Sequence, residues 1–120
     1  MLTPSEIIWN QDLSAGLNLP IAAFWDLFLA QVNRDWQRAG MPEVAFNFKT
    51  PKDQLFFERC LVDCLEQNPE LFFRYLYIVD IDERWIRAWT SGQMKSVNEL
   101  LAKLVLRTAQ KVRFRIEYSS

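Results

Sequence analysis

The most reactive side chains in this 120-residue sequence are two cysteines, Cys60 and Cys64. They lie four residues apart, which places both thiols on one face of a helix. Two thiolates supply only half of a tetrahedral zinc site, and no histidine or third cysteine of the same chain can complete it. We therefore interpret them as free, buried thiols that fill core space, with a dimer-bridging zinc site or a redox role as the alternatives.

A short acidic run, formed by Asp80, Asp82 and Glu83, is a second candidate for chemistry. Carboxylate oxygens bind Mg²⁺ and Ca²⁺, so three of them within four residues suggest a metal site. The same residue types also cap a helix and favour its positive N-terminal end. We favour the capping role, with Asp80 as the cap of the next helix, and predict no metal.

Histidine is absent from the sequence. Its absence removes the commonest general base and excludes Ser-His-Asp and Cys-His catalysis within one chain. The three glycines are isolated from one another, so no glycine-rich phosphate loop is present. We predict that the protein is not an enzyme and has no cofactor.

Four neighbouring residues, Arg84, Trp85, Arg87 and Trp89, have the composition of an interface. Arginine and tryptophan are enriched among the residues that contribute most to protein–protein binding. On a helix the two tryptophans share one face, and the two arginines lie beside each other. The alternative is that both tryptophans belong to the core, where tryptophan at helical spacing is more often found.

The carboxyl end of the chain is basic. Residues 95–120 carry six basic and two acidic residues, whereas residues 1–94 carry 8 basic and 13 acidic residues. Such a cluster can face phosphates or an acidic partner, but it can also protect an edge strand or pair with the protein's own acidic part. The residues concerned are Arg107, Lys111, Arg113 and Arg115.

A long apolar segment at residues 19–38 must organise the elements that carry these side chains. It is apolar on nearly every face of its first half, which predicts a helix enclosed by other helices, with Trp25, Phe28 and Leu29 almost fully buried. Further helix-start signals recur at Thr3, Thr50, Asn68, Asp80 and Ser96. We predict a mainly α, compact single-domain bundle of five or six helices around the central helix 19–38.

Two segments, 43–49 and 111–118, alternate between apolar and polar residues as strands do. An unpaired strand would leave its backbone groups without partners, so we expect the two to form a minor two-stranded β element. The alternative for 111–118 is that the last helix simply continues.

These features favour a small protein-interaction module, such as an adaptor, assembly factor, regulator or inhibitor of a partner protein. A homodimer is one form of this hypothesis. The alternatives are a nucleic-acid-associated protein that uses the basic carboxyl end, and a carrier of an apolar ligand. The net charge of −1 argues against nucleic acid. The longest apolar segment is too short to span a bilayer, and no signal peptide is evident, so we expect a cytoplasmic protein without membrane insertion.

Overall fold

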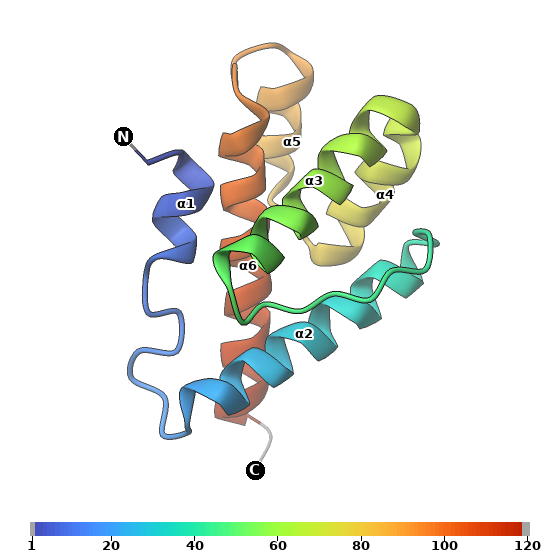
Figure 1. Cartoon of the computed structure of the whole chain (residues 1–120). Helices are drawn as coiled ribbons and strands as arrows, with labels where there is room; N and C mark the ends of the chain where they lie inside the picture. Colours follow the sequence, from blue (N-terminus) through green and yellow to red (C-terminus); the bar gives the residue numbers. More distant parts are fainter. Residues whose placement is uncertain (1, 119–120) are drawn as a thin grey trace.

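The computed structural model describes residues 2–118, which form six helices and contain no strand (Figure 1). The helices are α1 (Pro4–Trp9), α2 (Ile21–Arg38), α3 (Pro51–Gln67), α4 (Pro69–Val79), α5 (Glu83–Thr90) and α6 (Val97–Tyr118). The mainly α bundle predicted from the sequence is confirmed.

The helix-start signals at Thr50 and Asn68 act where the sequence places them. The Thr50 hydroxyl accepts a hydrogen bond from the Asp53 amide at 3.2 Å, and the Asp53 carboxylate accepts one from the Thr50 amide at 3.1 Å. Asn68 follows α3 and caps α4 through its side-chain oxygen, 3.3 Å from the Leu71 amide. One residue therefore ends the first helix and begins the second, which makes α3 and α4 a tight helical hairpin.

Asp80 does not cap α5, contrary to the sequence prediction. It lies at the C-terminus of α4 with a φ of 71°, and Asp82 caps α5 by accepting from the Arg84 amide at 3.0 Å. A left-handed residue is a common way to end a helix, and aspartate tolerates that conformation better than most residues do. The acidic run therefore contains the residue that ends α4, Asp80, and the residue that caps the start of α5, Asp82.

The centre of the bundle is α6 and not the predicted helix at 19–38. Helix α6 packs against α1, α2, α4 and α5, whereas the main contacts of α2 are with α4 and α6. Helix α6 buries eight residues between Leu100 and Val112, whereas α2 buries six.

The core is rich in aromatic rings. Phe28 of α2 is fully buried as predicted, and its ring contacts those of Trp9, Trp25 and Phe48 at centroid distances of 5.0 to 5.9 Å. Trp25 and Leu29 are only half-buried, so for these two residues the prediction of near-complete burial was wrong.

The predicted β element is also wrong. Residues 43–49 are extended but have no strand partner among the described residues, and residues 111–118 are the last two turns of α6. Val112 and Ile116 lie one turn apart and continue the stripe of Val105 and Ala109 onto the core. The helix therefore continues because this face still has apolar neighbours to cover it.

Within the described range, no helix combines the length and the apolar character that crossing a membrane requires. Helix α2 crosses the C-terminal half of α6 (Figure 1), and a surface lined by six cationic residues lies at this crossing.

Candidate functional site

A cleft of about 670 Å³ lies between the C-terminal halves of α2 and α6. We call it the basic cleft, because six of its lining residues are cationic and only one, Glu117, is acidic. Helix α2 contributes Arg34 and Arg38, and helix α6 contributes Arg107, Lys111, Arg113 and Arg115. The four basic site residues that the sequence singled out therefore line one surface.

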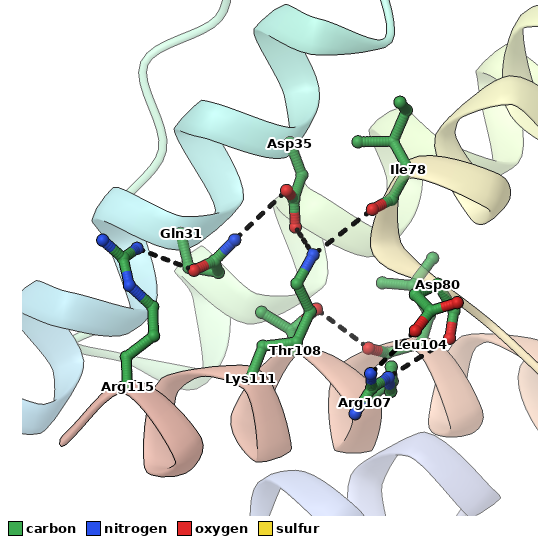
Figure 2. A network of polar contacts seen from close by, with 9 residues as sticks. All are labelled: Gln31, Asp35, Ile78, Asp80, Leu104, Arg107, Thr108, Lys111 and Arg115. Atoms are coloured by element: carbon green, nitrogen blue, oxygen red, sulfur yellow. Dashed lines mark hydrogen bonds and ion pairs between the residues drawn. The ribbon is translucent and has the colours of Figure 1, made fainter. Parts of the chain in front are cut away.

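A hydrogen-bonded network links residues of the basic cleft to the buried carboxylate of Asp35 (Figure 2). The Lys111 ammonium lies 2.9 Å from the carboxylate of Asp35, whose side chain is 1% exposed. It also donates to the Ile78 carbonyl at 3.3 Å, so one cation joins α2, α4 and α6. Gln31 donates to Asp35 at 3.1 Å and accepts from Arg115 at 3.0 Å. The helix crossing is thus held by a polar contact within an apolar core.

Tyr75 lies next to this network and is fully buried. Burial and the nearby negative charge of Asp35 both raise the pKa of its phenol. The phenol therefore stays neutral at physiological pH.

Two further cations are held by the chain itself. Arg107 donates to the carboxylate of Asp80 at 2.9 Å and to the carbonyl of the same residue at 3.2 Å. Arg113 donates to the carbonyls of Leu13 and Ala15 at 3.1 and 2.7 Å. The carbonyls are neutral, so the Arg113 contacts fix its position without cancelling its charge.

Arg34 and Arg38 are the site residues that sequence reasoning missed. Both are exposed, and neither side chain forms a hydrogen bond or an ion pair with any described residue. They lie four residues apart at the polar end of α2, so the sequence did place them on one helix face. The missing information was that this face would lie beside the basic end of α6.

An exposed aromatic pair borders the cleft. Phe114 and Tyr118 are 62% and 72% exposed, and their ring centres lie 4.6 Å apart on successive turns of α6. The two rings pack against each other beside the unpaired cations Arg34 and Arg38. They therefore give the cleft an apolar contact surface as well as charge.

The predicted Arg-Trp cluster of α5 is divided between surface and core. Arg84 and Trp85 line a neighbouring hollow of about 510 Å³, where Arg84 and Lys103 lie 4.8 and 4.1 Å from the centre of the Trp85 ring. Trp89 is half-buried against the core, and Arg87 is exposed but lines neither hollow. The structure therefore joins only Arg84 and Trp85 to the basic surface, through Arg107, which lines both hollows.

The two cysteines are free and half-buried. Burial raises the pKa of both thiols, and the negative charge of Asp63 adds to the effect at Cys60. Cys64 packs against Met41, with its sulfur 3.8 Å from the thioether sulfur. Among the described residues, no three metal-binding side chains gather at one point.

No family model, curated protein or solved structure matches the chain.

Proposed function

We propose that this chain is a non-catalytic protein-interaction module that binds an acidic segment of a partner protein in the basic cleft. The observation that carries the proposal is the excess of charge there: six cationic side chains and one carboxylate line the cleft. Arg34 and Arg38 contribute most of the positive charge that is available to a partner, because no described carboxylate pairs with them.

The cleft suits a protein segment better than a nucleic acid. Arg107 and Lys111 already pair with Asp80 and Asp35, and the whole chain has a net charge of −1. A long polyanion would be attracted weakly by such a chain. The exposed rings of Phe114 and Tyr118 add apolar contacts of the kind that protein interfaces use.

We place this function in the cytoplasm, since two free thiols suit a reducing compartment. The lack of histidine supports a role without catalysis.

The test is affinity capture with two charge-reversed baits. Arg34→Glu combined with Arg38→Glu should abolish capture of the main partner, because like charges then face its acidic segment. Lys52→Glu combined with Arg59→Glu is the matched control: it makes the same charge change on exposed residues of α3 and should leave capture intact.

Capture that is equal for both double variants would contradict the proposal. Salt-dependent retention of the wild-type chain on DNA, lost in the cleft variant, would assign the cleft to nucleic acid instead. Sedimentation analysis of the wild-type chain distinguishes a second copy of itself from a different partner.

A further inference from the structure

Three neighbouring hollows follow one another along α6. The hollow lined by Trp85 shares Arg107 and Gln110 with the basic cleft. A third hollow, of about 400 Å³, shares Trp85, Lys103 and Leu106 with the second. The three therefore adjoin one another, and we call them together the α6 trough.

One face of α6 runs along the whole trough. Its members follow one another at spacings of three or four residues, so they form a single helical stripe. They are Glu99, Lys103, Leu106, Gln110, Phe114 and Tyr118. At about 1.5 Å per residue, this stripe is roughly 28 Å long.

The chemistry of the trough changes along its length. At the N-terminal end of α6, the walls are apolar and include Ile7 and Ile8 of α1 together with Met94. At the C-terminal end, they are the arginines of the basic cleft. Ile7 is 47% exposed although it lines this surface, so the apolar end lies open to a partner.

We infer that the α6 trough binds an amphipathic α-helix of a partner protein, about five turns long, with acidic residues at one end and an apolar stripe at the other. This inference rests on the proposed function and extends it from the basic cleft to the whole groove. A helix of about 19 residues matches the length of this face of α6. Binding of the partner as an added β-strand would need an open sheet edge, and the described residues form no strand.

The direction of the bound helix follows from charge. Acidic side chains stabilise the N-terminal end of a helix, where the backbone dipole is positive. A partner whose acidic residues lie at its own N-terminus would place that end over Arg34 and Arg38. Its C-terminal, apolar end would then lie on Ile7, antiparallel to α6.

The experiment is selection of binders from a displayed library of random 20-residue peptides, with the wild-type chain as the target. Enriched peptides should carry Asp or Glu in the first half, and Leu, Ile or Phe at helical spacing in the second half. Ile7→Glu should weaken their binding at least about tenfold, as should the Arg34→Glu, Arg38→Glu pair. Ile21→Glu is the matched control, because Ile21 is 62% exposed but lies outside the trough, and it should have no effect.

Three results would overturn the inference. Peptides that are acidic throughout and insensitive to Ile7→Glu would refute the trough but leave the proposed function intact. Peptides without acidic enrichment, unaffected by reversal of Arg34 and Arg38, would refute both. Dodecanoate could displace the selected peptides and fail to bind the Ile7→Glu variant. That result would assign the apolar end of the trough to a fatty acid. Far-UV circular dichroism and urea midpoints confirm that each variant is folded.

Discussion

Replacing Lys111 by methionine should destabilise the protein, because it leaves the carboxylate of Asp35 buried without its cation. The two groups are 2.9 Å apart, and the side chains of Asp35 and Lys111 are 1% and 20% exposed. Methionine keeps most of the apolar stem of lysine, so the change removes charge with little change in packing. The expected decrease in the free energy of unfolding therefore measures how much an unpaired buried carboxylate destabilises the fold.

The magnitude follows from the geometry. At 2.9 Å and an effective dielectric constant of about 20, the attraction between unit charges is about 6 kcal/mol. Desolvation of both ions offsets much of this, and removal of one partner from a buried pair costs about 3–5 kcal/mol. Because Lys111 keeps some contact with water, we expect a loss of about 3 kcal/mol, a large part of the 5–15 kcal/mol that is typical of a domain.

Urea denaturation measures this loss. With a slope of about 2 kcal/mol per molar, the midpoint should fall by about 1.5 M. Lys103→Met is the matched control on the same helix. Lys103 lies over the ring of Trp85 and forms no ion pair with a described residue, so its replacement should cost less than about 1 kcal/mol.

A double variant decides whether the reasoning is right. Adding Asp35→Asn to Lys111→Met removes the unpaired charge and keeps an oxygen for the hydrogen bond from Gln31. The double variant should regain stability to within about 1 kcal/mol of the wild type. If it is as unstable as Lys111→Met alone, the loss comes from packing and the electrostatic account is refuted.

Three further predictions concern the core. Phe28→Ala should lower the free energy of unfolding by about 3–5 kcal/mol in thermal or urea unfolding, since this ring is fully buried; a loss below about 1 kcal/mol would be inconsistent with that burial. Burial raises the pKa of Glu58 above its ordinary value of 4.5, so its contribution to stability is lost as pH rises through the folded-state pKa. Glu58→Gln should therefore stabilise the protein at pH 7 but little at or below pH 4.5, and urea midpoints that differ equally at both pH values would contradict this. Cys60 and Cys64 should react with a disulfide reagent at pH 8 at least about tenfold more slowly than in unfolded chain, because burial raises the pKa of both thiols. Equal rates would show that they are open to solvent.

The helices could be predicted from the sequence, but the conformation of residues 111–118 could not. Val112 and Ile116 form one pair spaced four apart, and Phe114 and Tyr118 form another that is offset by two residues. Together they reproduce the alternation of a strand, although each pair is a helical spacing. Only the packing of Val112 and Ile116 against the core distinguishes a helix from a strand here. That packing depends on the tertiary structure and cannot be seen in the local sequence.

The basic cleft was predictable only in part. The cations of α6 are close in sequence, so their clustering was visible as local charge. Arg34 and Arg38 are more than 60 residues away, and nothing in their neighbourhood indicates which helix they face. Asp35 and Lys111 present the same difficulty, because a buried ion pair is recognisable only once both helices are placed.

The packing of α1 against α6 has a consequence for synthesis in the cell. Ser5 and Asn98 form two hydrogen bonds with each other, at 2.7 and 2.8 Å, although 93 residues separate them in the sequence. Helix α1 therefore cannot dock stably until α6 has been synthesised. Translation of the 22 residues of α6 takes about 1–4 s at ordinary elongation rates. During that interval the apolar faces of the earlier helices lack the surface that covers them. Chaperone binding to the nascent chain should therefore persist until α6 has left the ribosome.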